Sequence, residues 1–580
     1  MKSNIFKLLL IVSVVFMSVS CQDVLEPKPY SFYTENNFPK SNDDVNFVLS
    51  SFYANFSSEW GPQDPNILAT AKTNAEKKAA VMWSVYSCTN GWYHISTSCT
   101  DEMTDKWNPI TGAFSYNSGL GSWINGNNGP VLWNGLYQRV TVVAKATAFI
   151  KQFEDQVNTI KAKGTLSYKD STDIKLRVRA TAELKCMRAW TMFLLYDWFG
   201  AVDVRLDPDH LMDTELAVRP AADPNSEYTK NYLKHMVSDF KAAIKDMYSP
   251  SEALSGSNYG RLHKDVARML LMKHYMNYAS QTNIKTYWDS AKVYCDDIIN
   301  SNQYSLHPEY SEVFSKLTNT EPGTKEVIWA TTYGPTRQSW HFHTNLPKGC
   351  NNICGIDVDT ASLWDGFQIP WSFYYKYPTG DKRLKTIGSE FYKVNPKTGK
   401  NELIKLGTAA ALQTSLPTGA YAVKWLISFD RSSTGQYGFT AFRYADVLLS
   451  AAEIENNLNG PTQKAKDYLF QVTERSGTSK TVDFVNDETG NVVTGAATAL
   501  STADKQVFSD FLLDERGREL YWEGWRRMDM IRFKNANGLS KFIEYAQTQN
   551  KSADNKYLYF PLPFKAMTEG ASIYQNNPGY

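Results

Sequence analysis

Two glutamates, Glu519 and Glu523, form the pair of side chains in this sequence that is closest to a catalytic arrangement. A glycoside hydrolase uses two carboxylates that face one open cleft at a set separation. Here the spacing of four residues places both on one face of a helix, with Arg516 and Arg526 on either side. Carboxylates among guanidinium groups are ionised and paired. We therefore predict scaffold ion pairs at these positions and no hydrolytic activity.

Two groups of side chains have the chemistry of metal ligands. A nitrogen and sulfur set that suits Zn²⁺ consists of His341, His343, Cys350 and Cys354. A set that suits Ca²⁺ consists of Asp207, Asp209 and His210, or of Asp357 and Asp359. We favour cysteines that pair or stay buried in an oxidising compartment, and acids that are solvated in loops. The prediction is no cofactor, with Ca²⁺ as the alternative.

Aromatic residues make up 14% of the chain, more than a core of Leu, Ile and Val requires. Many stand in segments rich in Gly, Asn and Ser, namely Trp60, Trp83, Trp92, Tyr93, Trp107, Trp123, Trp133, Trp340, Trp364 and Trp371. Flat rings suit the C–H faces of pyranose sugars, and neighbouring amides and acids suit hydroxyl groups. The alternative for any one of these rings is core packing, which we favour for Trp83 and Trp133.

Composition and missing motifs exclude several classes of function. The 61 Lys and Arg balance 60 Asp and Glu, which removes the basic footprint of a nucleic-acid-binding protein. The local signatures of serine hydrolases, zincins and nucleotide-binding proteins are absent from the sequence. Of the other cysteines, Cys88 and Cys99 are loop neighbours that could bridge, whereas Cys186 and Cys295 lie on helix faces as small hydrophobic residues.

Helical periodicity alternates with long irregular segments. The spacing of apolar residues predicts helices over 41–56, 131–153, 173–198, 227–247, 263–279, 286–300, 442–457, 461–475 and 503–523. Lengths of this kind with short connections predict antiparallel pairs stacked like tetratricopeptide (TPR) repeats. Residues 57–130 and 303–440 are predicted to be irregular, apart from short strand-like runs such as 326–331. Loops mounted on a rigid scaffold commonly carry binding residues.

The N-terminus has the order of a secretory signal. Lys2 and Lys7 precede an apolar run, small residues follow, and Cys21 comes directly after Ser20. This resembles a bacterial lipobox, in which the cysteine is acylated and becomes the first residue, although Ser18 stands where Leu is usual. We predict a signal peptide over 1–20 and a lipid-anchored mature chain that begins at Cys21.

Several motifs in chain order resemble the SusD/RagB family of outer-membrane nutrient-binding lipoproteins of Bacteroidota. The most specific is DERGRELYWEGWRRMDMIR over 514–532, which is similar to the family signature ERxxELxxEGxRxxDLIR. CQDVLE at 21–26 with Pro29, FRYADVLL at 442–449 and QNNPGY at 575–580 also match. In FRYADVLL we interpret Arg443 and Asp446 as anchors at the edge of the core. The resemblance spans residues 21–580.

The resemblance implies a mostly α fold in which TPR-like helical hairpins are the scaffold and long irregular loops carry the ligand site. It implies a single domain over 21–580, with an N-terminal part to about 300 that holds the TPR-like helices and a C-terminal part from about 301. It further implies a surface lipoprotein, not an enzyme, that captures an oligosaccharide and covers a SusC/RagA-like TonB-dependent transporter in the outer membrane.

The family's binding face corresponds to two loops here, at about 101–130 and 332–345. The first opens with Asp101 and Glu102, which resemble the family's acidic pair. We predict the ligand-binding residues to be Trp107, Trp123, Asn125, Tyr333, Arg337 and Trp340. Trp123 and Trp340 are predicted stacking platforms with Trp107 as support, and Asn125 and Arg337 are predicted partners of hydroxyl groups.

Three alternatives to glycan capture stay open on the sequence alone. Peptide capture, known in the RagB branch of the family, needs an elongated cavity that encloses an extended backbone. A secreted glycoside hydrolase would release products, and a purely structural transporter subunit would bind no ligand of its own. Binding measurements that also follow product release separate these classes.

Overall fold

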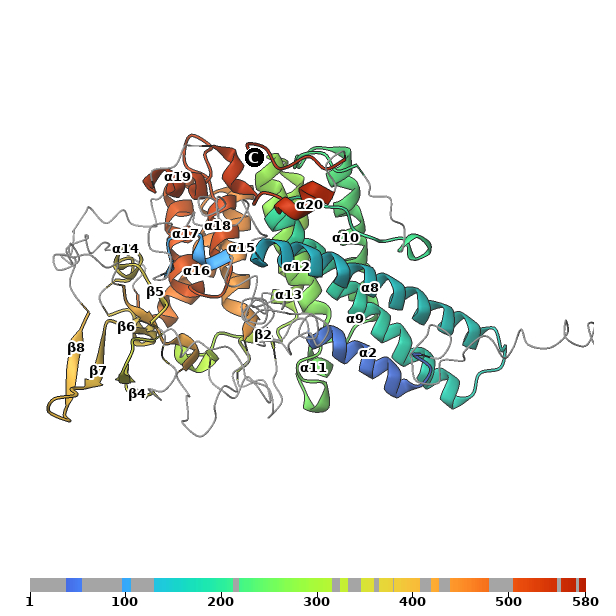
Figure 1. The fold of residues 1–580 in the computed structure, drawn as a ribbon, viewed down its shortest axis with the longest axis horizontal. Helices are drawn as coiled ribbons and strands as arrows, with labels where there is room; N and C mark the ends of the chain where they lie inside the picture. Colours follow the sequence, from blue (N-terminus) through green and yellow to red (C-terminus); the bar gives the residue numbers. More distant parts are fainter. Residues whose placement is uncertain are drawn as a thin grey trace, which may run out of the picture. The chain divides into compact units, whose positions relative to one another are not determined.

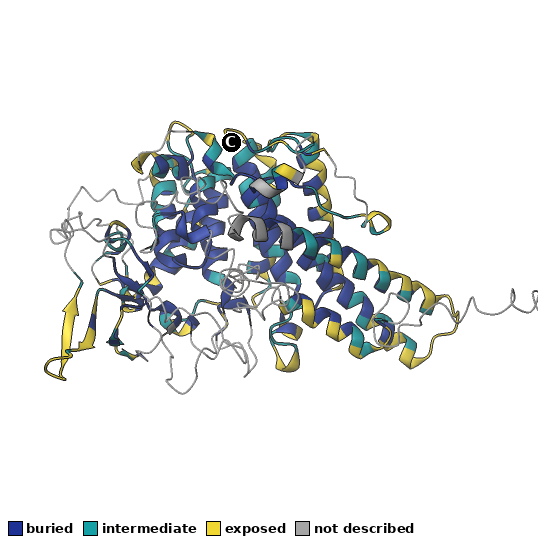
Figure 2. Cartoon of the chain, viewed as in Figure 1, coloured by how far each residue is buried: buried dark blue, intermediate teal, exposed yellow. Residues whose placement is uncertain are grey.

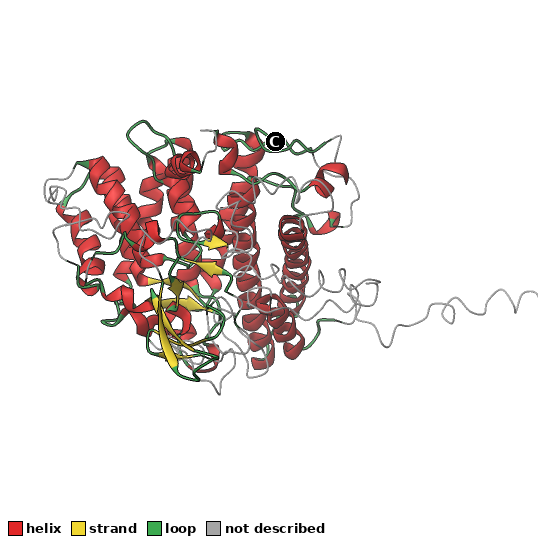
Figure 3. Ribbon diagram, turned by 60° about the vertical axis from the view of Figure 1, so that its left-hand side comes forward, coloured by secondary structure: helices red, strands yellow, loops and turns green. Residues whose placement is uncertain are grey.

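Long helices form most of the described chain (Figures 1 and 3). The structure is a computed structural model. It describes residues 38–54, 96–105, 130–211, 218–314, 324–331, 346–358, 363, 365–378, 380–406, 419–426, 439–478, 504–549, 554–569 and 573–580. The chain divides into two units after Leu49, inside helix α2 (Asn42–Ala54), and the second unit, Ser50–Tyr580, holds everything described below. The predicted mostly α fold is confirmed.

The longest helices are α8 (Pro130–Lys161) and α9 (Tyr168–Phe199), which pack against each other. Ser167 starts α9 with a capping box. Its hydroxyl accepts a hydrogen bond from the backbone N–H of Asp170 at 3.1 Å, and the Asp170 carboxylate accepts one from the backbone N–H of Ser167 at 3.0 Å. Gly200 ends the helix with a φ of 74°, a conformation that suits glycine. The helix predicted over 173–198 is therefore confirmed and begins five residues earlier, at Tyr168.

The six other predicted helices between residues 227 and 523 are confirmed to within three residues at each end, and five shorter helices of the described chain were not predicted. They are α10 (Glu227–Asp246), α11 (Pro250–Ala253), α12 (Lys264–Thr282), α13 (Thr286–Asn300), α14 (Trp371–Tyr374), α15 (Tyr444–Asn459), α16 (Gln463–Arg475), α17 (Lys505–Leu520), α18 (Arg526–Arg532), α19 (Lys541–Thr548) and α20 (Phe564–Glu569). The pairs α9–α10, α10–α12, α12–α13, α13–α15 and α15–α16 pack in succession, as expected of a TPR-like stack.

Short turns of 3₁₀ helix connect these elements. They are η2 (Pro208–His210), η3 (Gly256–Asn258), η4 (Tyr310–Phe314), η8 (Lys382–Thr386), η10 (Lys424–Leu426) and η11 (Asn555–Leu558). The helix predicted over 503–523 stops at Leu520, because Trp522 and Gly524 take φ values of 57° and 85°. Glu523 consequently lies in the turn after α17, off the helix that carries Glu519.

Small antiparallel sheets lie in the segment predicted to be irregular. The pairs are β1 (Thr104–Asp105) with β5 (Phe367–Gln368), β2 (Val327–Ala330) with β10 (Thr440–Arg443), and β6 (Ile387–Gly388) with β9 (Tyr421–Ala422). A four-stranded sheet has the order β4 (Ile356–Asp357), β3 (Cys350–Ile353), β7 (Glu390–Val394) and β8 (Asn401–Lys405). Strand β2 confirms the strand-like run at 326–331, whereas the four-stranded sheet was not predicted.

Most of the residues on the central helices are buried (Figure 2). The core is aromatic where these helices meet the β2–β10 pair. The ring of Trp190 on α9 lies 5.4 Å from Trp329 on β2 and 5.1 Å from Phe442 on β10, measured between centroids. Phe442 in turn lies 5.7 Å from Trp525, which precedes α18. All four rings are buried, and they join four distant parts of the sequence through edge and tilted contacts. Within the described ranges, no helix has the length and apolar content that crossing a bilayer requires.

Candidate functional site

The base of the first predicted ligand loop is held by the C-terminal motif. Asp101, which opens the loop, accepts two hydrogen bonds from Arg526 at 2.7 and 2.8 Å and one from Lys376 at 3.0 Å. Burial opposes the ionisation of Asp101, but these two cations outweigh it and hold its pKa well below the usual range. The indole N–H of Trp522 donates to the carbonyl of Glu102 at 2.9 Å. These contacts hold the first two residues of the predicted loop, Asp101 and Glu102, in place.

The six residues predicted to contact ligand, namely Trp107, Trp123, Asn125, Tyr333, Arg337 and Trp340, lie outside the described residues, as does Cys21. Their roles stay predictions. Of the tryptophans predicted as sugar platforms or core, Trp371 has a described side chain. It is buried at the start of α14 and packs on Tyr374 and Tyr375, with centroids at 5.2 and 5.8 Å. At this position the core-packing alternative is therefore confirmed.

Glu102 is a buried acid whose two carboxylate oxygens have no hydrogen-bond partner in the described part of the chain. Burial raises the pKa of Glu102 well above its ordinary value, against the opposing field of Arg526. The unfolded chain therefore loses this proton at lower pH than the folded protein does. As a result, folding stability falls as the pH rises from the ordinary glutamate pKa towards the raised one.

Glu102→Gln is expected to raise the melting temperature by a few degrees at pH 7.5 and to leave it nearly unchanged at pH 4, because glutamine stays neutral at both. Thermal melting of both proteins across this range measures the effect. Asp101→Asn is the matched control, since the ionised form of Asp101 stabilises the fold and its loss lowers the melting temperature at pH 7.5. An equal shift of Glu102→Gln at both pH values would contradict the assignment.

Glu519 lies at the centre of a buried charge network. Its carboxylate accepts hydrogen bonds from Arg383 at 3.0 Å, from Arg443 and from Arg475. The network has five acids and five bases, namely Asp381, Glu326, Glu515, Glu519 and Glu523 with Arg383, Arg443, Arg475, Arg518 and Lys424. Burial opposes the ionisation of Glu519, yet the three arginines keep its pKa well below the usual range.

The predicted scaffold ion pairs are confirmed, but their partners differ from those expected. Two arginines flank the glutamates in sequence. Arg516 pairs with Asp446 and Asp529, and Arg526 pairs with Asp101. Glu523 instead pairs with Arg443 and Lys424. Both glutamates are 0% exposed. They are sealed from any substrate, so this pair lacks the open cleft that glycoside hydrolysis needs.

A second buried network joins four helices around Asp446. Lys273 on α12 and Arg516 on α17 both donate to Asp446 on α15, at 2.6 and 2.8 Å. Arg516 also donates to Asp529 on α18 at 2.8 Å. Burial lowers the pKa of Lys273 to about 8, although Asp446 partly restores it. Arg443 and Asp446, predicted at the edge of the core, are each 1% exposed and therefore belong to its interior.

The candidate metal ligands weighed above are described only in part. Asp207 caps η2 by accepting from the N–H of Asp209, and Asp357 accepts from the side chain of Asn352 at 2.9 Å. Cys350 is buried and Cys354 is exposed, and both are free thiols, as is Cys99. His341, His343, Asp359 and Cys88 lie outside the described residues. No group of three or more His, Cys, Asp or Glu side chains suited to a metal occurs in the described ranges.

Comparison with known proteins identifies the family. The model described as "SusD family" matches residues 325–580. SusD-like protein P25 of Formosa agariphila is 32% identical over 444 residues, which are 71% of this chain and 75% of that protein. This chain belongs to the SusD family. All ten members of the Glu519 network fall within the matched segment, so the family's sequence pattern here encodes a buried ionic scaffold.

Solved structures share this fold along most of its length. A SusD superfamily protein from Parabacteroides distasonis has a TM-score of 0.64 at 18% identity, and covers 93% of this chain and 100% of that one. Surface glycan-binding protein A from Bacteroides fluxus has a TM-score of 0.59 at 17% identity, with coverage of 93% and 100%. B. fragilis NanU has a TM-score of 0.61 at 16% identity, with coverage of 93% and 97%.

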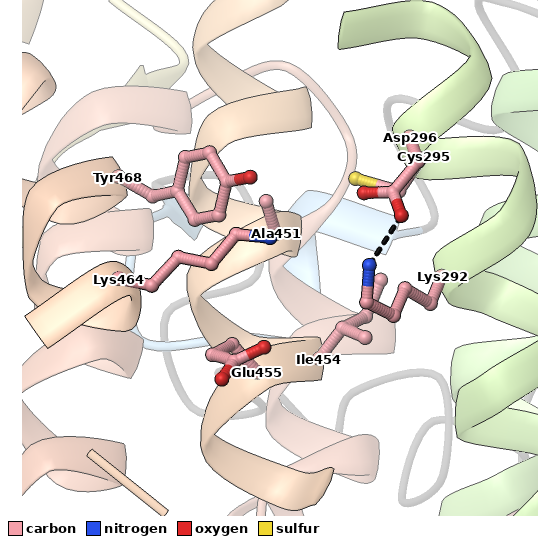
Figure 4. Close-up of a pocket in the computed structure, with 8 residues that line it drawn as sticks. All are labelled: Lys292, Cys295, Asp296, Ala451, Ile454, Glu455, Lys464 and Tyr468. Carbon is pink, nitrogen blue, oxygen red and sulfur yellow. Dashed lines mark hydrogen bonds and ion pairs between the residues drawn. The ribbon is translucent and has the colours of Figure 1, made fainter. Parts of the chain in front are cut away.

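A polar pocket between α13, α15 and α16 of this SusD-family protein is too small for a sugar (Figure 4). Lys292 pairs with Asp296 on one side, and Lys464 and Tyr468 face them from α16. The cavity measures about 10 Å³, which is about the space of one water molecule. We therefore do not assign a ligand subsite to it.

Proposed function

We propose that this protein is a cell-surface lipoprotein that captures an oligosaccharide without cleaving it and passes it to a SusC-like TonB-dependent transporter. The observation that carries the proposal is the combination of SusD-family membership with a fixed base for the predicted ligand loop, where Arg526 clamps Asp101. The name of surface glycan-binding protein A from Bacteroides fluxus, which has the same fold, supports a glycan as the ligand. The sealed state of Glu519 and Glu523 supports binding without hydrolysis.

Trp123→Ala and Trp340→Ala are each expected to weaken oligosaccharide binding by about 1–3 kcal/mol, the cost of deleting an aromatic stacking surface. Affinity electrophoresis or calorimetry against the glycan that the wild type binds measures this loss. Tyr168→Ala is the matched control, because Tyr168 is an aromatic residue 90% exposed at the start of α9. Variants that fold normally and keep the affinity of the wild type would place the ligand site elsewhere.

Cys21→Ala is expected to move the protein from the membrane fraction to the soluble fraction, because the acyl chains on this residue supply the proposed anchor. Cell fractionation without detergent, followed by immunoblotting, makes the comparison. Cys354→Ala is the control, since Cys354 is an exposed free thiol within the folded part. A Cys21→Ala protein that stays with the outer membrane after washing argues against the lipid anchor.

A further inference from the structure

Helix α9 packs against both α8 and α10 (Figure 1). A groove lies along α9 beside these two helices. It consists of two adjoining hollows of about 280 and 380 Å³ that share Val178 and Asp246. The first is lined by all three helices, and the second extends to Glu252 on α11 and Lys264 at the start of α12. Each hollow has about the volume of the smaller ligand sites in proteins. We name this surface the α9 groove.

The floor of the α9 groove is aliphatic. Val157 of α8, Val178 and Ala182 of α9 and Ala242 of α10 line the first hollow, and no aromatic residue lines either hollow. The hydroxyl of Thr181, in the same floor, is buried and has no hydrogen-bond partner in the described residues. Such a surface suits aliphatic side chains rather than sugar rings, which favour aromatic platforms.

The second hollow carries an excess of positive charge. Its bases are Lys175, Arg179, Lys245 and Lys264, and its acids are Asp246 and Glu252. Arg179 is occupied, because it pairs with Glu252 at 3.4 Å and lies 3.7 Å above the ring of Tyr248. The ammonium groups of the three lysines form no hydrogen bond or ion pair with any described side chain. They are therefore available to an anionic partner.

At the opposite end of the α9 groove the charges are already matched. Lys185 of α9 pairs with Glu154 of α8 at 2.7 Å. The groove is thus polarised, with an aliphatic floor, a neutral end and a basic end. We propose that the α9 groove binds a peptide segment of a partner protein, with small aliphatic side chains along the floor and carboxylates among Lys175, Lys245 and Lys264. This site goes beyond the proposed glycan function and does not depend on it.

Fluorescence anisotropy with a labelled probe peptide tests the proposal. The probe is Leu-Ala-Ala-Leu-Asp-Glu-Glu with a free C-terminus, and its counterpart has lysine at the three acidic positions. We expect saturable binding of the acidic probe, weaker binding at higher salt, and none of the basic counterpart. The double variant Lys175→Glu with Lys245→Glu is expected to weaken binding at least tenfold.

Charge reversal at Lys230 and Lys234 is the matched control, because both are exposed on α10 and line neither hollow. This variant carries the same change in net charge and is expected to bind the probe like the wild type. Circular dichroism melting confirms that each variant folds. The proposal is overturned if the acidic probe does not saturate, if both double variants weaken it equally, or if an acidic oligosaccharide binds this groove and the peptide does not.

Discussion

Glu519→Gln is expected to lower the free energy of unfolding by about 3–5 kcal/mol, the cost of breaking a buried ion pair from one side. The substitution keeps the size of the side chain and removes its charge, so Arg383, Arg443 and Arg475 stay buried with one anion fewer. Since a domain is stable by about 5–15 kcal/mol, the loss is a large share of the total. Urea unfolding followed by tryptophan fluorescence measures it.

Glu390→Gln supplies the comparison for Glu519→Gln. Glu390 is exposed on β7, and its neutralisation is expected to change stability by about 0.5 kcal/mol or less. The two variants lose the same charge, so the difference between them isolates burial. A Glu519→Gln protein as stable as Glu390→Gln would show that the network contributes little to folding. Glycan turnover that Glu519→Gln abolishes would mean that Glu519 is catalytic.

Asp446→Asn is expected to cost a similar 3–5 kcal/mol, because it leaves Lys273 and Arg516 without the anion that they share. The pKa of Lys273 in the folded protein is already about 8, below its ordinary 10.5. Between those values the unfolded chain binds the proton more readily, so stability rises with pH through this range. Because Asp446 raises the pKa of Lys273, its loss lowers that pKa further, so the variant gains more stability than the wild type and its deficit shrinks as the pH rises from 7 through 8.

A double-mutant cycle identifies the cause of the Asp446→Asn loss. Lys273→Met removes the buried cation, so the pair Asp446→Asn with Lys273→Met should be less destabilised than the sum of the two single variants. Lys534→Met is the control substitution. Lys534 donates to the carbonyl of Ser280 and not to Asp446, so its loss should add to that of Asp446→Asn. Strictly additive losses for Lys273→Met would mean that the two side chains do not stabilise each other.

Local sequence patterns were sufficient for the helices and insufficient for what joins them. The stripe of apolar residues along α9 and the capping box at Ser167 are local signals, and the predicted helix was correct to within five residues at its start and one at its end. The partners of Glu519 come from positions 44, 76 and 136 residues away. Arg516 and Arg526 were the wrong partners, because Arg516 pairs with acids of two other helices and Arg526, which follows the turn after Leu520, pairs with Asp101.

The four-stranded sheet was missed for a different reason. Strand β7 has one buried residue and β8 has none, so neither shows the alternation by which a half-buried strand is recognised. In their register Tyr392 faces Leu403 and Glu390 faces Lys405, pairings that only the fold reveals. At the candidate site, the sequence singled out the acidic pair at 101–102 but did not distinguish the clamped Asp101 from Glu102, whose carboxylate has no hydrogen-bond partner in the described residues.

The most direct test of the proposed function is calorimetry of the soluble protein that begins after Cys21, against a panel of oligosaccharides and peptides, with chromatography of the ligand afterwards. The account predicts saturable binding of at least one oligosaccharide, which is recovered intact. Binding of peptides alone would contradict it in favour of a peptide-capturing protein. Recovery of shortened sugars would contradict it in favour of a hydrolase.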